Sequence, residues 1–427
     1  MPVKTNILAN YFGAAVVALA PVLAMPWYLS ALGSQQFGLV GFITLMQAVL
    51  GLLDAGMAQA LVREIAVRFD PSERSRIRTA TLLFGFERIY WLFAVLVGAV
   101  VWLCSGLIAA HWLNLGSMPL TAGRLAIEGA AVLFAVQFPG SVYRSLLIGA
   151  QAQIKLNLVT FAGAVFRHLG AVMAVIMWPS VLTYVLWHAG AAFFETLVRR
   201  FLAWKLLRVH GAQVRWDAAE IWLVWRTVVG LSGAALLGAL TVQMDKIVLS
   251  RMVSLDQFGY YSLASSVATG LLMLIYPLVQ AVLPRAIQLR SEPAALRLLS
   301  VKLMGLIAAM VVCGALVFLL GGHWLLAIWL KDAAAVTAIY PLLAVLLLGT
   351  AMNAFYNVGY VNWLVHKNVR RVLQVNVLAL VLAVTVTPML VAWRGSMGAT
   401  FGWFVINLIG LLLSFEWVRR KPHEKYH

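Results

Sequence analysis

Long apolar runs, each long enough to cross a membrane, follow one another along almost the whole of this chain of 427 residues. The hydrocarbon core of a bilayer is about 30 Å thick, and a helix needs about 20 mostly apolar residues to cross it. The runs are bounded by charged or turn residues, and they predict about twelve such helices. We expect these helices over residues 7–32, 36–62, 79–110, 122–148, 155–178, 180–203, 221–250, 257–284, 298–320, 334–365, 372–393 and 397–418.

The composition excludes a soluble protein. Hydrophobic residues make up 63% of the chain and charged residues 11%, where soluble domains have about 45–50% and about 25%. The loops between the expected helices are short, so they leave no room for a sizeable soluble domain. We therefore expect an all-α polytopic membrane protein.

Basic residues outnumber acidic residues by 32 to 15, which gives a formal net charge of +17. In a soluble chain such an excess suggests a nucleic-acid partner, whereas in a membrane protein it collects in the cytoplasmic loops. Most of the loop Lys and Arg residues fall on one side of the expected helices. The other side has four: Arg124, Arg251, Lys331 and Arg394. This asymmetry predicts that both termini lie in the cytoplasm, and it argues against a nucleic-acid partner.

The motifs of several enzyme classes are missing from the sequence. No G-x-x-x-x-G-K-S/T loop occurs, which argues against a nucleotide-driven pump. The histidines and the two cysteines are scattered without metal-ligand spacing. The loops opposite the basic ones are short and carry no pair of acidic residues for a glycosyltransferase or polymerase base. We expect a protein that is not an enzyme, with no catalytic residue, metal site or cofactor.

A sequence repeat relates the two halves of the chain. Gln36-Phe37-Gly38 recurs as Gln257-Phe258-Gly259, and Gln59-Ala60 recurs as Gln280-Ala281 at the same offset. The first two helices therefore resemble the seventh and eighth, which predicts two six-helix lobes in a parallel pseudo-twofold repeat. We expect lobes at 1–203 and 221–418, a cytoplasmic linker at 204–220 and a cytoplasmic tail at 419–427. Two such lobes are typical of alternating-access transporters.

Four basic residues lie inside the expected spans, away from the ends that would let them reach the headgroups: Arg88, Arg144, Arg167 and Lys246. Arg167 stands near the middle of its span, where an arginine costs at least about 2.5–3.5 kcal/mol on insertion scales. We expect it to face a cavity shared by both lobes. Arg144 follows a Pro139-Gly140 break, whose freed backbone groups must meet protein or water. A cationic lumen of this kind favours an anionic substrate, such as one with a phosphate group.

Polar residues form stripes on several of the expected spans. The residues that we expect to line a lumen are Asn10, Gln47, Asp54, Ser265, Thr269, Tyr276, Gln280, Asn353, Tyr356, Asn357 and Tyr360. Each of them alone is compatible with packing between helices, and tyrosine is also a common anchor at the membrane interface. Several stripes together favour a water-filled lumen, in which the tyrosines could stack on a sugar.

Two acid–base neighbours have a simpler interpretation as structural charge pairs. Arg88 follows Glu87, and Arg124 stands four residues before Glu128 on one helix face. Asp245 and Lys246 are adjacent in the sequence, so we expect them to point to different faces and to find partners elsewhere.

Several short motifs resemble those of the polysaccharide transporters that include the O-antigen flippases. In the first half these motifs are Asn10-Tyr11-Phe12-Gly13, Pro26-Trp27-Tyr28, Leu32-Gly33, Gln36-Phe37-Gly38, Leu53-Asp54-x-Gly56 and Arg63-Glu64. The second half adds Asp245-Lys246-Ile247-Val248-Leu249 and Gln257-Phe258-Gly259-Tyr260-Tyr261-Ser262. The resemblance covers the whole chain in layout, and the larger group contains lipid II flippases and multidrug antiporters of the MATE type.

The resemblance implies a flippase of the bacterial inner membrane that moves a polyprenyl-pyrophosphate-linked oligosaccharide by alternating access. That substrate would be an O-antigen or exopolysaccharide repeat unit, with its pyrophosphate in the cationic lumen. The implied energy source is an ion gradient or the membrane potential. The implied partners are the lipid-linked anionic glycan, membrane lipids and glycan-assembly proteins. The role of Asp54 would be binding of the coupling ion or neutralisation of a neighbouring arginine.

Two alternatives remain open at this point. A MATE-type antiporter of small molecules would need acidic residues for cationic drugs, and the charge balance argues against it. A glycan polymerase or ligase would need a long loop with catalytic residues on the side opposite the cytoplasm, and the expected loops there are short.

Overall fold

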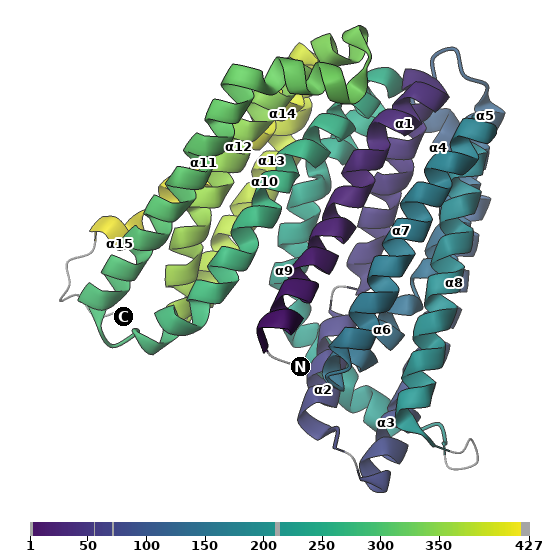
Figure 1. Cartoon of the computed structure of the whole chain (residues 1–427), viewed down its shortest axis with the longest axis vertical. Coiled ribbons are helices and arrows are strands. Elements are labelled where there is room, and N and C mark those ends of the chain that lie inside the picture. Colours follow the sequence, from purple (N-terminus) through teal and green to yellow (C-terminus); the bar gives the residue numbers. More distant parts are fainter. Residues whose placement is uncertain (1–2, 55, 71, 210–213, 420–427) are drawn as a thin grey trace. The chain divides into compact units, whose positions relative to one another are not determined.

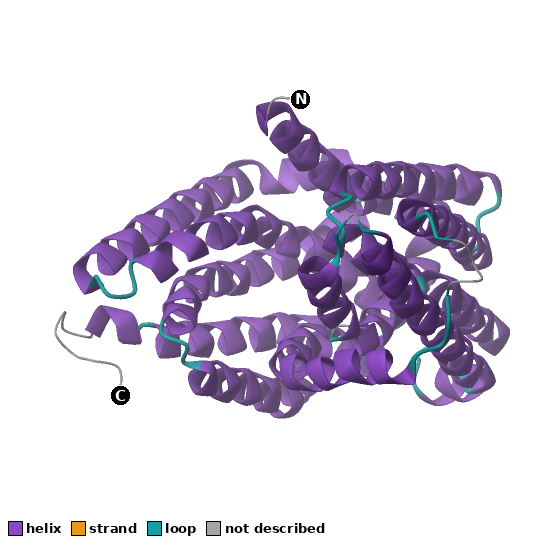
Figure 2. Cartoon of the chain, turned by 90° about the horizontal axis from the view of Figure 1, so that it is seen from below, coloured by secondary structure: helices purple, strands orange, loops and turns teal. Residues whose placement is uncertain are grey.

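The structure is a computed structural model, which describes residues 3–54, 56–70, 72–209 and 214–419. For residues 3–18, 68, 223, 225–235 and 419 it describes the backbone alone. All regular elements of this described part are helices (Figure 2). The chain divides into two compact units, Met1–Ala239 and Leu240–His427, which we call unit 1 and unit 2.

Unit 1 contains eight numbered helices and the beginning of a ninth (Figure 1). Their bounds are α1 Val3–Gly51, α2 Met57–Arg68, α3 Glu73–Leu103, α4 Ser105–His111, α5 Leu120–Gln137, α6 Gly140–Gly149, α7 Gln153–Met177 and α8 Val181–Leu207. A short 3-10 helix, Leu52–Asp54, follows α1, and α9, Ala218–Met252, passes from unit 1 into unit 2. The helices of unit 2 are α10 Leu255–Gln288, α11 Pro293–Leu330, α12 Ala333–Val365, α13 Val369–Arg394, α14 Ser396–Ser414 and α15 Glu416–Arg419.

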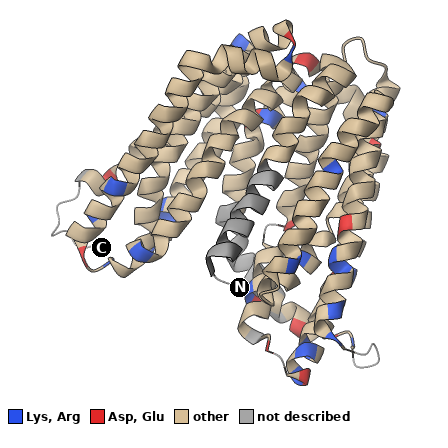
Figure 3. Ribbon diagram, in the orientation of Figure 1, with Lys and Arg blue, Asp and Glu red and all other residues tan. Residues whose placement is uncertain are grey.

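Ten helical segments of the described part are long and apolar enough to cross a membrane. Lys, Arg, Asp and Glu residues are sparse along the helices, and in unit 2 they lie mainly towards the helix ends (Figure 3). The prediction of an all-α, multi-pass membrane protein is therefore confirmed. The count of about twelve spans and the pseudo-twofold repeat stay predictions.

Gly33 divides α1 into two helices. Its backbone has φ 75° and ψ 167°, a conformation that is essentially restricted to glycine. The break falls between the two expected spans 7–32 and 36–62, so α1 contains both the first span and the start of the second.

Two other spans are broken inside their apolar runs. The expected helix 36–62 is wrong as a single helix, because α1 ends at Gly51 and α2 begins only at Met57. The expected helix 122–148 breaks where Pro139-Gly140 predicted it, since α5 ends at Gln137 and α6 begins at Gly140. Proline has no backbone N–H to donate and its ring clashes with the carbonyl one turn earlier, which explains the second break. Phe138, the residue before the proline, keeps helical dihedrals of φ −56° and ψ −44°.

The boundary between the two units lies later than the linker expected at 204–220. Helix α8 continues to Leu207, and α9 begins at Ala218. Ile221 and Val224 of α9 are buried in the core of unit 1, and Glu220 pairs with Arg78 of α3. The start of α9 is therefore part of unit 1, and the division falls between Ala239 and Leu240. Residues 210–213 and 420–427, which belong to the expected linker and tail, lie outside the described residues.

Polar side chains begin several of the helices that follow short loops. Ser180 accepts hydrogen bonds from the backbone N–H groups of Leu182 and Thr183 at 3.0 and 3.4 Å. Asp332 and Asn368 cap α12 and α13 in the same way, with donor–acceptor distances of 3.0 and 3.1 Å. Such caps satisfy backbone donors that have no partner within the helix, and thereby fix where the spans begin.

Candidate functional site

A carboxylate held by two arginines lies near the middle of α7 and α8 in unit 1. The Arg167 Nη2 atom donates to Glu195 Oε2 at 2.6 Å, and Arg199 donates to the other oxygen of the same carboxylate. Arg199 also donates to the Thr160 hydroxyl at 3.3 Å. The exposed fractions of the side chains are 21% for Arg167, 14% for Arg199 and 8% for Glu195. Both arginine side chains are therefore largely but not completely buried.

Two glycines make room for this group. A Cβ atom on Gly163, one turn before Arg167, would lie 3.0 Å from the carboxyl carbon of Glu195. A Cβ atom on Gly140, at the start of α6, would lie 3.5 Å from Arg199 Nη1 and 2.9 Å from the Thr196 hydroxyl. Glycine lets other groups approach the backbone closely, so these positions allow α6, α7 and α8 to surround the carboxylate.

Arg144 gives this cluster an excess of positive charge. It lies on α6, is exposed, and is within electrostatic reach of both Arg199 and Asp54. Three guanidinium groups thus share two carboxylates. We call Arg144, Arg167, Glu195 and Arg199 the arginine cluster. Guanidinium groups bind carboxylate and phosphate through paired charge-assisted hydrogen bonds, so the arrangement is suited to an anionic group.

Asp54 connects the two broken helices of unit 1. Its carboxylate accepts a hydrogen bond from the Tyr90 hydroxyl at 2.5 Å and another from the Ser141 hydroxyl. The ring of Tyr90 stacks on Phe138, with centroids 5.0 Å apart. The carboxylate therefore lies where the 52–56 break meets the 138–139 break. Its proximity to Arg144 supports a neutralising role, and binding of a coupling ion stays a prediction.

Other predicted residues of unit 1 lie outside the arginine cluster. The Arg88 guanidinium is exposed and lies 3.7 Å from the centroid of the Phe84 ring. The proposed pairing of Arg88 with Glu87 is wrong, because Glu87 pairs with Arg200 at 2.6 Å. The long Arg200 side chain of α8 reaches Glu87 from the neighbouring helix, whereas residues adjacent on one helix diverge.

Two other predicted residues of unit 1, Gln47 and Arg124, make structural contacts. Gln47 donates to the backbone carbonyl of Ala130 at 2.8 Å, which supports its interpretation as a packing contact between helices. The Arg124–Glu128 pair is confirmed, with 2.7 Å between Nε and Oε1. The side chain of Asn10 lies outside the described residues.

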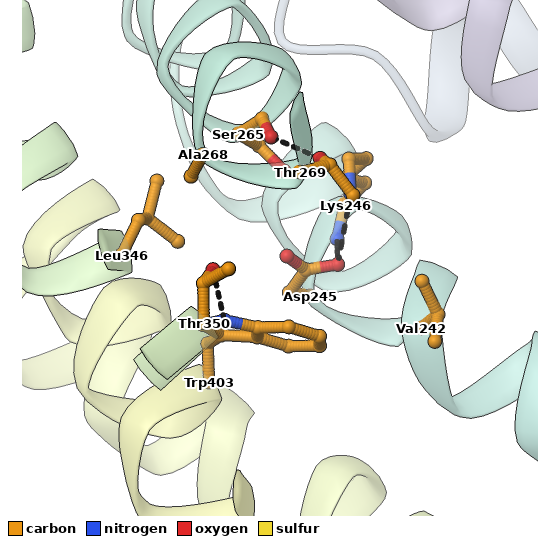
Figure 4. Close-up of a pocket in the computed structure, with 9 residues that line it drawn as sticks. All are labelled: Val242, Asp245, Lys246, Ser265, Ala268, Thr269, Leu346, Thr350 and Trp403. Carbon is orange, nitrogen blue, oxygen red and sulfur yellow. Dashed lines mark hydrogen bonds and ion pairs between the residues drawn. The ribbon is translucent and has the colours of Figure 1, made fainter. Parts of the chain in front are cut away.

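A small pocket in unit 2 brings together three of the predicted residues. Lys246, Ser265 and Thr269 line it. The other lining residues are Val242, Asp245, Ala268, Leu346, Thr350 and Trp403 (Figure 4). Within the pocket Thr269 donates to the Ser265 carbonyl, and Trp403 donates to the Thr350 hydroxyl at 3.4 Å. Helices α9, α10, α12 and α14 all contribute to it.

The expectation that Asp245 and Lys246 point apart is wrong. Lys246 Nζ lies 3.6 Å from Asp245 Oδ1, and the carboxylate also accepts a hydrogen bond from the Tyr261 hydroxyl. The four-carbon stem of lysine is long and flexible enough to turn back to the neighbouring side chain. Lys246 is therefore balanced by its own neighbour, and the pocket has less excess charge than the arginine cluster.

The asparagines of α12 connect helices. Asn353 donates to the side-chain oxygen of Asn407 on α14 at 2.7 Å, and Asn357 donates to the Asn353 carbonyl at 2.8 Å. The tyrosines of the same stripe lie together: the rings of Tyr356 and Tyr360 have centroids 6.0 Å apart. The hydroxyl of Tyr276 on α10 is within electrostatic reach of Tyr356, and the Gln280 side chain is exposed.

Glu195 and Arg199 are not among the site residues that the sequence predicts. Arg199 lies close to the end of the expected span 180–203, where a basic side chain is expected to reach the cytoplasmic headgroups, whereas α8 continues to Leu207. The four-residue spacing from Glu195 to Arg199 is the signal that could have found the pair, since these positions share one helix face. The contact between Glu195 and Arg167 joins two helices and could not have been found from spacing.

Comparisons with known proteins extend along the whole chain. Residues 3–290 match the protein family described as polysaccharide biosynthesis protein. A protein of Shigella flexneri, provisionally named an O-antigen transporter, is 21% identical over 98% of both chains.

Two solved structures show the same fold. One is the inward-facing conformation of a multidrug resistance MATE family transporter of the MOP superfamily, with a TM-score of 0.74, 14% identity and coverage of 96% of this chain and 97% of the other. The second is the lipid II flippase MurJ in an inward closed conformation, with a TM-score of 0.70, 12% identity and coverage of 97% and 87%. The fold is therefore that of the MOP-superfamily transporters. With its family match over two thirds of the sequence, the chain belongs to the polysaccharide biosynthesis protein family.

Proposed function

We propose that this protein is a flippase that moves a polyprenyl-pyrophosphate-linked oligosaccharide, such as an O-antigen or exopolysaccharide repeat unit, across the bacterial inner membrane. Alternating access carries the glycan from the cytoplasmic to the opposite side while the lipid tail stays in the bilayer. Its partners are the lipid-linked glycan, membrane lipids and glycan-assembly proteins. Family membership and the provisional name of the Shigella flexneri relative support this substrate class.

The arginine cluster is the observation that carries the proposal. Two of its guanidinium groups, those of Arg167 and Arg199, bind the Glu195 carboxylate at mid-span, and the third, Arg144, lies near Arg199 and Asp54. Charges in the middle of a membrane helix are expensive and are retained where they serve a pathway. A pyrophosphate binding here would compete with Glu195 for Arg167 and Arg199 and would also use the exposed Arg144.

The energy source follows from the sign of the substrate charge. Both termini and the basic loops lie in the cytoplasm in this proposal, as the distribution of Lys and Arg favours. The cytoplasmic side of a bacterial membrane is electrically negative, so outward movement of an anion is favourable by about 2.3 kcal/mol per charge for each 100 mV. The membrane potential alone can therefore drive export, without a cofactor or nucleotide, and the protein is a transporter and not an enzyme.

A MATE-type antiporter of small molecules is the alternative. The likeness to a multidrug transporter concerns the fold, since the two chains share 14% identity. A binding site for cationic drugs would need unpaired carboxylates. The four membrane-embedded acids at the candidate sites, Asp54, Glu87, Glu195 and Asp245, each accept a hydrogen bond or ion pair from a neighbouring side chain. This pattern favours the anionic substrate.

The proposal is tested by measuring glycan export in cells that lack their own copy of the protein and express either wild type or a variant. Arg167→Gln should abolish glycan export at normal protein abundance, because the loss of one charge-assisted contact weakens binding of the pyrophosphate by roughly 10- to 100-fold. The purely structural explanation is that Arg167 only neutralises Glu195. The double variant Arg167→Gln/Glu195→Gln distinguishes substrate binding from neutralisation of Glu195, since it removes both charges.

The double variant should stay inactive if Arg167 binds substrate. Recovery of export in the double variant, with loss in the single variant, would show that Arg167 serves the carboxylate alone and would refute the substrate role. Arg124→Gln is the matched control, because Arg124 also pairs with a carboxylate, Glu128, but lies apart from the cluster. It should leave export unchanged.

A further inference from the structure

An aromatic and amide surface lies on α10 and α12 of unit 2, with its α10 residues exposed and its α12 residues, Tyr356 and Tyr360, partly buried. Tyr276 and Gln280 stand one turn apart on α10, with Tyr276 41% exposed and Gln280 also exposed. Tyr356 and Tyr360 stand one turn apart on α12, with ring centroids 6.0 Å apart and planes inclined by 31°. The hydroxyls of Tyr276 and Tyr360 are both within electrostatic reach of Tyr356. We call these four residues the tyrosine surface.

The polar atoms of the tyrosine surface indicate that it faces a polar medium. Among the described residues, none forms a hydrogen bond with the three tyrosine hydroxyls or with the Gln280 amide. An amide or hydroxyl left without a partner in hydrocarbon costs several kcal/mol, roughly 4–8 on the cyclohexane scale. Lipid is therefore a poor neighbour for this surface, and water or a ligand with hydroxyl groups is a good one.

The arrangement also differs from that of tyrosines that anchor a helix at the membrane interface. Anchoring tyrosines lie at the headgroup level, with the apolar ring towards the lipids and the hydroxyl towards water. Here Tyr356 packs edge-on against Trp363, with centroids 6.0 Å apart, and lies next to Gly410 of α14. A Cβ atom on Gly410 would lie 3.6 Å from the Tyr356 ring. The ring is held from behind, so it loses little conformational entropy when a ligand stacks on it.

We infer that the tyrosine surface is a subsite for the sugar rings of the substrate. The face of an aromatic ring carries partial negative charge, and the C–H groups on one face of a pyranose carry partial positive charge, so the two stack favourably. The Gln280 amide offers both donors and an acceptor to sugar hydroxyls. The ligand class is an oligosaccharide with at least one ring face free of axial hydroxyls.

The inference rests on the proposed function, because it assigns the sugar part of the proposed substrate to these residues. It goes further in one respect: phosphate contacts supply charge attraction that any polyprenyl pyrophosphate would share, whereas stacking depends on the sugar. The tyrosine surface is therefore the place in unit 2 where the identity of the glycan affects binding.

Comparing the binding of two lipids separates the contribution of the sugar to affinity from that of the pyrophosphate. The first probe is the polyprenyl-pyrophosphate-linked oligosaccharide extracted from the host cells, and the second is bare undecaprenyl pyrophosphate. Binding of each to the full-length protein in lipid nanodiscs is measured for wild type, Tyr356→Leu, Tyr356→Phe and Tyr276→Leu. Tyr340→Leu is the matched control, since Tyr340 also lies on α12 but stacks on Phe318 at 4.9 Å, outside the tyrosine surface.

Wild type should bind the sugar-bearing lipid more tightly than the bare lipid. Tyr356→Leu and Tyr276→Leu should each weaken binding of the sugar-bearing lipid by roughly twofold to tenfold and leave the bare lipid unchanged, because each removes one stacking face. Tyr356→Phe should keep most of the affinity, since the ring remains. Tyr340→Leu should behave as wild type.

Four other results would overturn the inference. Equal losses for both lipids would mean that the tyrosines support the fold and not the sugar, and unchanged binding in both Leu variants would mean that they do not contact it. Equal affinity of wild type for the two lipids would refute the sugar subsite but would leave the proposed function standing. Failure of wild type to bind either lipid would overturn the proposed function together with the subsite.

Discussion

At the scale of single residues, charge compensation separates the basic side chains that the sequence treats alike. Arg88, Arg144, Arg167 and Lys246 all stand inside apolar runs, and the sequence ranks them only by their depth in the expected spans. In the structure Lys246 is paired with its neighbour Asp245, and Arg88 lies against the Phe84 ring. Arg167 belongs with Arg199 and Glu195, which come from a different helix. The charges could be predicted from the sequence, but their partners could not, because tertiary contacts decide them.

The hydroxyl of Tyr90 provides a test at the same scale. Tyr90→Phe keeps the ring that stacks on Phe138 and removes the 2.5 Å hydrogen bond to Asp54. A hydrogen bond to a charged group contributes about 1.5–3 kcal/mol, so the free energy of unfolding should fall by that amount in denaturant unfolding of the purified protein. Tyr340→Phe is the control, since its ring also stacks on a phenylalanine and its hydroxyl has no hydrogen bond to the described residues. Equal stability of the two variants would contradict the account of Asp54.

At the scale of helices, the sequence predicts breaks that have a local cause and misses the one that has a tertiary cause. Pro139-Gly140 interrupts 122–148 through the backbone chemistry of proline, and Gly33 interrupts α1 through a conformation that other residues avoid. The apolar run 36–62 contains no proline, and its break follows Gly51. The hydrogen bonds that hold Asp54 at this break come from Tyr90 and Ser141, far away in sequence.

The break at Gly33 leads to a prediction about the stability of α1. Gly33→Ala should lower the free energy of unfolding by about 1–3 kcal/mol, because alanine is strained at φ 75° and ψ 167°. No atom lies within 4 Å of a Cβ added there, so the effect is one of backbone conformation alone. Gly305→Ala in the middle of α11 adds a methyl group to similarly open space with helical backbone, and it should be neutral or stabilising. Equal effects in thermal or denaturant unfolding would contradict this explanation.

At the scale of the whole molecule, composition and run length determine most of what can be predicted. The all-α membrane architecture follows from apolar runs with few charges, and ten candidate spans are present in the described part of the chain. The division into units is less predictable. The basic stretch at 204–220 has the composition of a linker, yet the start of α9 packs into unit 1 through Ile221 and Val224. Whether a helix end is buried depends on the residues that it packs against, and these cannot be predicted from a change in composition along the sequence.

Transbilayer movement of the substrate in proteoliposomes is the most direct test of the central claim. The purified protein should accelerate the appearance of the lipid-linked oligosaccharide in the opposite leaflet, and a potential that is negative on the side of origin should increase the rate. Arg167→Gln/Glu195→Gln should move the lipid no faster than vesicles without protein. Wild-type protein that moves the lipid no faster than protein-free vesicles would contradict the account, and so would a double variant that moves the lipid as fast as wild type.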